Sequence, residues 1–257
     1  MVSYNKKIQG PPMATEDFFK LCKSGTFKEV QVAIKSGVNV NARNEYGVTP
    51  LMFAVEYNED REVIKTLINA GADVNAEDES DKTPLMYASE YCKNEKIVKL
   101  LLRSRAEINA RNKYGEISLM HGAWNANSEI TKLLIQAGAE VNVQDLHGRT
   151  SLMKAAGYNE NAEVIRLLLE AGENVNVADN EGKTSLMYAA ENNSNVEVVS
   201  LLLNAGADIN AVDYLGNNVL MAAGSNWKDE CGQIIILDKR NLKYLEKHLL
   251  LFQVPDW

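Results

Sequence analysis

Hydrophobic and polar positions repeat along the chain with a period close to 34 residues. One leucine recurs in steps of 34, 34, 33, 34 and 34 residues, at Leu51, Leu85, Leu119, Leu152, Leu186 and Leu220. An asparagine keeps the same register, at Asn41, Asn75, Asn109, Asn142, Asn176 and Asn210. Two markers in one register indicate a tandem array of one supersecondary unit, in which each copy packs on its neighbours.

Within one period the apolar positions predict two short helices. Leu51 and Ala54 lie on one stripe of the first helix. The second helix follows from apolar residues at helical spacing, Val63, Ile64, Leu67 and Ile68. Thr49 followed by Pro50 predicts where the first helix begins, because Thr accepts from the free amides of the first turn and Pro at this place loses no hydrogen bond.

Glycines mark the turns around these helices. One glycine precedes the first helix, where a tight turn needs positive φ, at Gly47, Gly115, Gly148, Gly182 and Gly216. Another ends the second helix, at Gly71, Gly138, Gly172 and Gly206. A Val-Asn or Ile-Asn segment then extends into the next turn, so the predicted unit is turn, helix, helix and extended finger.

The two ends of the array differ from its middle. Residues 1–13 are polar and interrupted by proline, which predicts a mobile lead. Thr15 is predicted to cap the first helix, and the pair in 14–44 should shield the end of the stack. The array over 14–237 then continues through repeats 45–78, 79–112, 113–145, 146–179, 180–213 and 214–237. Residues 238–257 predict a C-terminal capping helix and tail, with a partner-binding or membrane-surface helix as the alternative.

The unit carries Thr-Pro-Leu-x-x-Ala at residues 49–54 and Gly-Ala-Asp-Val-Asn-Ala at residues 71–76. In this pattern and period the chain resembles the ankyrin repeat family over residues 14 to 235. The resemblance implies an all-α solenoid of helix-turn-helix units with short β-hairpin-like fingers. It also implies a binding module whose finger tips and first helices line a concave surface that holds another protein.

The chain departs from the family at two places. Methionine stands where the family usually has histidine, at Met52, Met86, Met120, Met153, Met187 and Met221. Every repeat but the fourth has one extra residue between its helices. We therefore expect asparagine-rich segments such as residues 158–161 to form local turns in place of the family's histidine-mediated hydrogen bonds.

Aromatic side chains gather at the positions that the resemblance assigns to the binding surface. Eight of the ten tyrosines fall there. The finger tips carry Tyr46, Tyr114, His147 and Tyr214. Two helix positions four residues apart carry Phe53 and Tyr57, Tyr87 and Tyr91, His121 with the nearby Trp124, Lys154 and Tyr158, and Tyr188. Residues at i and i+4 share a helix face, and aromatic rings supply rigid contact area, so we expect a partner-binding groove. The alternative is that inner residues such as Phe53 and Tyr188 only pack on their neighbours.

Local rules are broken in the middle of the array. Asp81 replaces the turn glycine, and Arg105 replaces the glycine after the second helix. In the fourth repeat Ile117 replaces the capping Thr and Gly122 replaces the small Ala. Clusters of broken rules often mark functional sites. Our hypothesis is that His121, Trp124 and Tyr91 hold the partner most tightly; neutral drift in a tolerant array is the alternative.

Charge and composition narrow the class of partner. The formal net charge of -8 disfavours nucleic acid, whose phosphates need clustered Lys and Arg, and it favours a basic partner. Cys22, Cys92 and Cys231 are odd in number and far apart, which indicates reduced thiols. No apolar run reaches the length of about 18 residues that a membrane span needs.

The motifs of common enzymes are missing from the sequence. His121 and His147 have no Cys or carboxylate at ligand spacing, so we expect no metal, no cofactor and no enzymatic activity. The prediction is a monomeric, cytoplasmic module that binds a protein or peptide, with delivery into a host cell left open. The alternative function is an assembly scaffold that self-associates through its C-terminal helix.

Overall fold

A computed structural model describes residues 13–222 of the 257-residue chain. Its contacts divide the chain into two compact units, Met1–Lys113 and Tyr114–Trp257, which are described one at a time. Residues 1–12 of the predicted lead lie outside the described part. The predicted C-terminal helix over 238–257 and residues 223–237 of the last repeat lie outside it as well.

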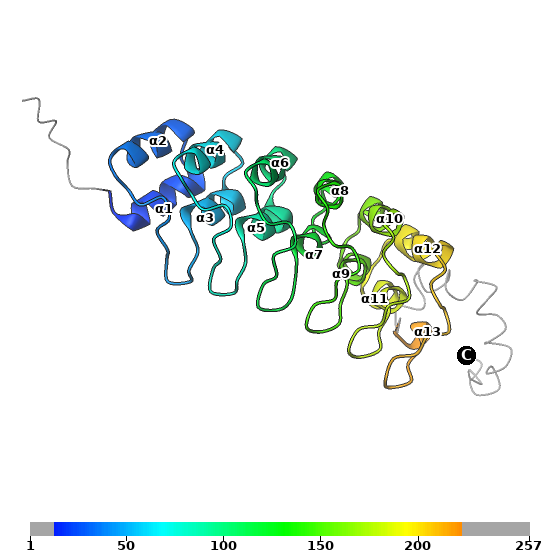
Figure 1. The fold of residues 1–257 in the computed structure, drawn as a ribbon. Helices are drawn as coiled ribbons and strands as arrows, with labels where there is room; N and C mark the ends of the chain where they lie inside the picture. The colour runs from blue at the N-terminus through cyan, green and yellow to red at the C-terminus, as the bar shows by residue number, and fades with distance from the viewer. Residues whose placement is uncertain (1–12, 223–257) are drawn as a thin grey trace, which may run out of the picture. The chain divides into compact units, whose positions relative to one another are not determined.

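The first unit consists of three stacked helix pairs. Its helices are α1 (Thr15–Ser24), α2 (Phe27–Lys35), α3 (Pro50–Tyr57), α4 (Arg61–Asn69), α5 (Pro84–Tyr91) and α6 (Glu95–Arg103). The helices α1, α3 and α5 pack side by side in one row, and α2, α4 and α6 form a second row (Figure 1). Two loops, residues 36–49 and 70–83, extend beyond the first row and form the predicted fingers.

The second unit repeats this arrangement. Its helices are α7 (Ser118–Gly122), α8 (Ser128–Gln136), α9 (Ser151–Tyr158), α10 (Ala162–Glu170), α11 (Ser185–Asn192), α12 (Val196–Asn204) and α13 (Val219–Ala222). The first helices α7, α9, α11 and α13 pack in sequence, as do α8, α10 and α12. Two fingers contain isolated antiparallel β-bridges, Ala178 to Thr184 and Val212 to Asn218. The described residues contain no β-strand longer than these single bridges. The predicted all-α class is therefore confirmed.

Small and flexible side chains fill the space between neighbouring first helices. The recurring alanines are completely buried, at Ala54, Ala88, Ala155 and Ala189. Most of the recurring methionines are also buried, at Met52, Met86, Met120, Met153 and Met187, whereas Met221 near the end of the described residues is half exposed. A methyl group lets two helix backbones approach closely, and the pliable thioether fills the remaining gap.

Threonine caps start three of the seven first helices in residues 13–222, whereas Thr184 precedes α11 without a side-chain cap bond. The Thr49, Thr83 and Thr150 hydroxyls each accept a hydrogen bond from an amide in the first turn. Ile117 offers no such cap, and α7 has only five residues. The prediction that Thr15 caps α1 is wrong: Ala14 is the extended N-cap residue, its carbonyl accepts the first helical hydrogen bonds, and Thr15 is already helical.

Within residues 13–222, two residues other than glycine adopt the left-handed conformation, and both stand where other repeats carry glycine, as predicted. Asp81 has a φ of 59° and Arg105 a φ of 68°. At the corresponding turn, Gly47 has a φ of 72°, and a Cβ atom there would lie 2.9 Å from the Glu79 amide. The turn at Asp81 therefore carries strain that glycine avoids elsewhere in the array.

Buried asparagines join three of the helix-helix turns to the repeat before them. The Asn193 Nδ2 group donates to the Ala156 carbonyl at 2.8 Å and to the Asn159 carbonyl at 3.0 Å. Its Oδ1 atom accepts from the Asn195 amide at 2.8 Å. Asn58 and Asn159 make the same three kinds of hydrogen bond in their own repeats. These side chains form the predicted local turns, and they also bond between repeats, which the prediction did not include.

The finger asparagines bond in the opposite direction along the chain. The Asn176 Nδ2 group donates to the Gly206 carbonyl at 3.0 Å, and its Oδ1 atom accepts from the Asp208 amide at 2.8 Å. Asn41, Asn75 and Asn142 bond the following repeat in the same way. Within each unit, these asparagines therefore satisfy polar backbone groups of a neighbouring repeat, which that repeat in isolation would leave unpaired.

The buried asparagine ladder can be tested at two adjacent positions. We expect Asn193→Ala to lower the free energy of unfolding by about 2 to 4 kcal/mol, because it leaves buried backbone groups without partners. The matched control is Asn192→Ala, since Asn192 is exposed and bonds only within its own helix. Urea denaturation followed by circular dichroism measures both, and equal stability of the two variants would contradict the assignment.

Candidate functional site

Aromatic rings line the first-helix row of the first unit. The Phe53 ring packs edge-on against Phe19, with centroids 5.5 Å apart, and against Tyr57 at 4.9 Å. In the next repeat the Tyr87 and Tyr91 rings lie 6.2 Å apart. The i and i+4 positions therefore share a face, as predicted, and the rings contact one another along it.

A cleft of about 490 Å³ opens between these rings and the fingers of the first unit. Tyr46 and Glu79 of the fingers line it, together with Phe53 and Tyr57 of α3 and Tyr87 of α5. Tyr46 and Tyr57 are exposed, with 63% and 45% of their surface accessible, whereas Tyr87 is buried. The lining of the cleft therefore combines aromatic rings with the carboxylates of Glu56, Asp78 and Glu79.

We call the first residue of each i, i+4 pair the inner position and the second the outer position. The tyrosines at the inner position hydrogen-bond the first helices to the fingers. The Tyr87 hydroxyl donates to Asp78 Oδ2 at 2.8 Å, and the Tyr188 hydroxyl donates to Asp179 Oδ2 at 2.6 Å. Burial, and then the neighbouring aspartate, raise the pKa of both phenols. The other oxygen of each aspartate accepts two backbone amides of its finger turn. The inner positions thus fix the finger geometry, which explains why they are less exposed than the outer ones.

A lysine occupies the space beside each of these inner tyrosines. The Lys82 ammonium lies 2.8 Å from Glu90 Oε2 and sits over the Tyr87 and Tyr91 rings, 4.8 and 5.4 Å from their centroids. In the second unit the Lys183 ammonium lies 3.0 Å from Glu191 and 5.9 Å from the centroid of Tyr188. We call these the two lysine sites. The hydrogen bond to Glu191 raises the pKa of Lys183.

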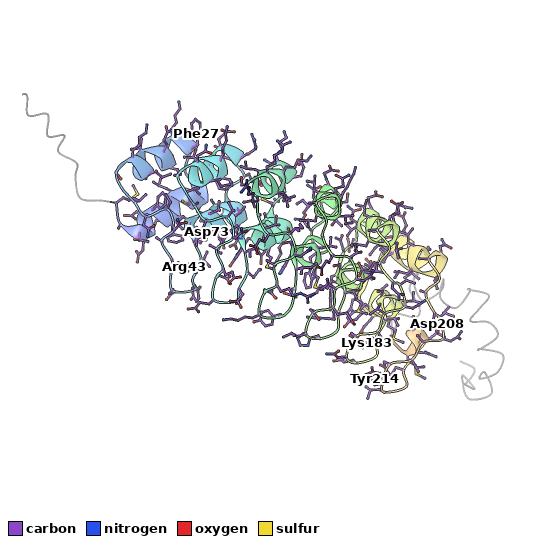
Figure 2. The ribbon with its side chains drawn as sticks, viewed as in Figure 1. Phe27, Arg43, Asp73, Lys183, Asp208 and Tyr214 are labelled. Carbon is purple, nitrogen blue, oxygen red and sulfur yellow. The ribbon has the colours of Figure 1, made fainter. Side chains whose placement is uncertain are left out.

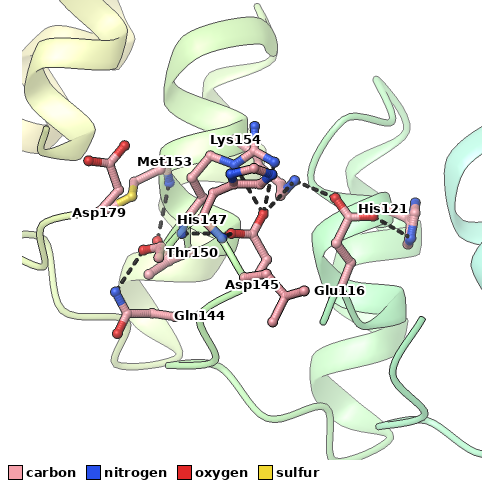
Figure 3. Close-up of polar contacts among 12 residues, drawn as sticks. Glu116, His121, Gln144, Asp145, His147, Thr150, Met153, Lys154 and Asp179 are labelled. Atoms are coloured by element: carbon pink, nitrogen blue, oxygen red, sulfur yellow. Dashed lines mark hydrogen bonds and ion pairs between the residues drawn. The ribbon is translucent and has the colours of Figure 1, made fainter. Parts of the chain in front are cut away.

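A network of charges replaces this arrangement around α7 and α9, in the first two repeats of the second unit (Figure 3). Lys154 is 5% exposed, and its ammonium lies 2.7 Å from Glu116 and 3.3 Å from Asp145. The Arg149 guanidinium pairs with Asp145 at 3.0 Å. His121 Nε2 lies 3.6 Å from the second oxygen of Glu116. A buried network of this kind holds its members in one geometry, so Lys154 and His121 have little freedom to reach a partner.

The exposed rings of the second unit lie next to this network. Trp124 stacks on Tyr158 with centroids 5.2 Å apart and an interplanar angle of 26°, and the Lys154 ammonium lies 5.9 Å from the Trp124 ring. Both rings are about half exposed. Tyr214 lies on the finger before α13 (Figure 2) and is 76% exposed.

The structure sorts the predicted binding residues into three groups. Exposed are Tyr46, Tyr57, Tyr91, Tyr114, Trp124, His147, Tyr158 and Tyr214; partly buried are Phe53 and Tyr188; buried are Tyr87, His121 and Lys154. Tyr91 belongs to the first unit and His121 and Trp124 to the second. Their joint role in holding a partner stays a prediction.

Sequence reasoning missed the charged residues that organise this surface. Lys82 and Lys183 occupy the same register position, directly before the capping Thr, and Glu90 and Glu191 follow the inner tyrosines by three residues. Glu116 holds the lysine position in its own repeat and pairs with Lys154 of the next. This periodic pairing of charge was the signal that could have identified them.

One buried carboxylate lies apart from the aromatic surfaces. Glu173 is 5% exposed at a register position where other repeats carry a small residue such as Ala72, Ala139 or Ala207. Its Oε1 atom accepts the Leu152 amide at the start of α9, at 2.7 Å. Burial raises the pKa of this carboxyl to about 7, against the opposing hydrogen bonds from Thr150 and Leu152.

Residues 13–222 hold no group of three or more His, Cys, Asp or Glu side chains placed to bind a metal ion. Across the same residues, the helices are all too short or too polar to span a bilayer.

Comparison with family models identifies the repeats. A model for ankyrin repeats in three copies matches residues 18–112 and again residues 119–213, and a second model for many copies of the repeat matches residues 93–135. A search of curated proteins finds no significant match. The matched residues include most of both units and more than half of the chain.

The raised pKa of Glu173 predicts how stability depends on pH. The folded chain holds the Glu173 proton more tightly than the unfolded chain does. The free energy of unfolding therefore falls as pH rises from about 4.5 to 7. In the unmodified chain this decrease in the free energy of unfolding is up to about 3 kcal/mol, at 1.36 kcal/mol per pKa unit. We expect it to be absent in Glu173→Gln. Thermal unfolding at pH 5 and pH 8 measures it. The control is Glu170→Gln, which changes an exposed carboxylate on α10. An unchanged pH dependence in Glu173→Gln would refute the assignment.

Proposed function

The chain belongs to the ankyrin repeat family, whose repeats are generally protein-protein interaction modules, and we propose that it binds a protein or peptide through exposed aromatic side chains of its first helices and finger tips. The main support for this proposal is that aromatic rings held by neighbouring rings remain exposed to solvent. Tyr57 and Tyr91 have 45% and 44% of their surface accessible, and Tyr158 and Trp124 have 55% and 50%.

These rings are held in place before any partner arrives. Tyr57 packs on Phe53, Tyr91 lies beside the hydrogen-bonded Tyr87, and Tyr158 stacks on Trp124. A side chain that is already ordered loses little entropy on binding, so its contact area converts more fully into affinity. Tyrosine and tryptophan also offer a polar tip, which suits a surface that is wet when unbound.

The acidic character of the chain supports a basic partner. The net charge is -8, and the cleft of the first unit has Glu56, Asp78 and Glu79 in its wall against the single cation Lys82, which Glu90 already neutralises. Charge of one sign accelerates the encounter with a partner of the other sign and makes it sensitive to salt. The family is typically non-enzymatic, and the proposal is accordingly recognition by a cytoplasmic monomer, with no turnover and no cofactor.

The proposal is tested by removing the exposed rings together. We expect the triple variant Tyr57→Ala, Tyr91→Ala and Tyr158→Ala to lose at least tenfold in affinity for the partner that the unmodified chain captures from extracts of its source cells, because interface anchors of this type each contribute about 1 kcal/mol or more. Quantitative capture followed by isothermal titration measures the loss.

The matched control removes exposed apolar surface from the opposite row of helices. Phe27→Ala and Val32→Ala change exposed residues of α2, which lie outside the first-helix row. They should leave capture unchanged. A triple tyrosine variant that keeps its helical spectrum and captures the same partner with unchanged affinity would refute the proposed surface.

A further inference from the structure

The repeats of this chain show one cation site in filled and unfilled forms. In the repeat 79–112 the ammonium of Lys82 pairs with Glu90 and lies over two tyrosine rings. In the repeat 180–213 Lys183 pairs with Glu191 beside one tyrosine. The chain itself therefore demonstrates that an aromatic ring on the first helix and a glutamate three residues later bind a lysine side chain.

The repeat 45–78 keeps the acceptors of this site and lacks the lysine. Phe53 and Tyr57 hold the two ring positions and Glu56 holds the glutamate position. The lysine position is occupied by Val48, which is buried against Met52 in the core. The Glu56 carboxylate accepts a hydrogen bond from the Tyr57 hydroxyl, which raises the pKa of that phenol, and it forms no ion pair within residues 13–222.

The unfilled site opens into the cleft of the first unit. Phe53, Glu56 and Tyr57 line this cleft, and Asp78 and Glu79 add two further carboxylates from the finger. Its volume of about 490 Å³ falls within the range of about 300 to 1,000 Å³ that is usual for pockets that bind small ligands. The outer ring position already carries a cation, since the Lys23 ammonium lies 4.5 Å from the Tyr57 centroid, so the unfilled part of the site in the described residues is the Glu56 carboxylate beside Phe53.

We propose that this cleft binds a lysine side chain from a basic segment of the partner, with the ammonium on Glu56 and the aliphatic stem against Phe53 and Tyr57. The inference rests on the proposed function and adds the chemistry that the partner must present. Unmodified lysine fits better than a neutral or fully alkylated form, because its N–H groups can donate to the carboxylate as Lys82 does to Glu90.

The test uses a single lysine as the probe. The full chain labelled with nitrogen-15 is titrated with N-acetyl-lysine methylamide at millimolar concentration, and the amide shifts are followed by NMR. We expect saturable shifts for residues that line the cleft, such as Tyr46, Glu56 and Glu79. The same probe with an acetylated side-chain nitrogen should produce shifts at least five times smaller at equal concentration.

Three variants then separate binding at the cleft from binding elsewhere on the chain. Glu56→Gln should lower the affinity for the probe at least fivefold. Val48→Lys should prevent probe binding, because the new lysine side chain would pair with Glu56 itself. Glu191→Gln, which alters the filled site of the second unit, should leave binding at the cleft unchanged. If Val48→Lys fails to fold, Glu56→Gln alone decides. Equal affinity of the probe for Glu56→Gln and the unmodified chain, or shifts confined to residues outside the cleft, would overturn the inference.

The outcome is distinguishable from a failure of the proposed function. Loss of partner capture in the triple tyrosine variant, combined with no probe binding at the cleft, would overturn the lysine site and keep the proposed surface. Probe binding that depends on Glu56, combined with unchanged capture by the triple variant, would support the lysine site in the cleft. The same result would refute the proposal that the wider aromatic surface binds the partner.

Discussion

Hydrogen bonds between neighbouring repeats are the constraint on which both units depend. Two short helices joined by a turn expose more backbone polar groups at their ends than they can satisfy alone. Asn193 reaches back to two carbonyls of the preceding repeat, and Asn176 reaches forward to the end of the next second helix. Apolar burial drives the stacking, but these bonds fix its register, because a buried amide that finds no partner costs about 1 to 3 kcal/mol.

Because the repeats stack in a fixed register, side chains from successive repeats of one unit form a continuous surface. The inner positions of the first helices are committed to the fold, either through the bond of Tyr87 to Asp78 or through the ion pairs of Lys154. The outer positions stand four residues further along the same face and stay exposed. Affinity for a partner is then available from rings that are already in place, while the lysine sites show which charge this surface prefers.

The sequence predicted the fold well because its signals are local and repeated. Leucine spacing, Thr caps and turn glycines each act within one repeat, and the ankyrin fold they predicted is confirmed. Apart from the cap of α1, where Ala14 and not Thr15 is the N-cap residue, the failures concern contacts between repeats. The partner of Asn193 lies in a preceding repeat, and the burial of Lys154 depends on Glu116 of its neighbour. Period and residue type revealed which positions recur, but not which side chains the next repeat would cover.

The most direct test of this account is the exchange rate of asparagine side-chain amides, measured by NMR in the full chain. The account predicts slow exchange for the Nδ2 groups of Asn58, Asn159 and Asn193, since each donates two hydrogen bonds to the repeat before it. The exposed amide of Asn192 supplies the fast reference. Exchange of the three buried amides at the rate of Asn192 would contradict the claim that these bonds hold the repeats in register.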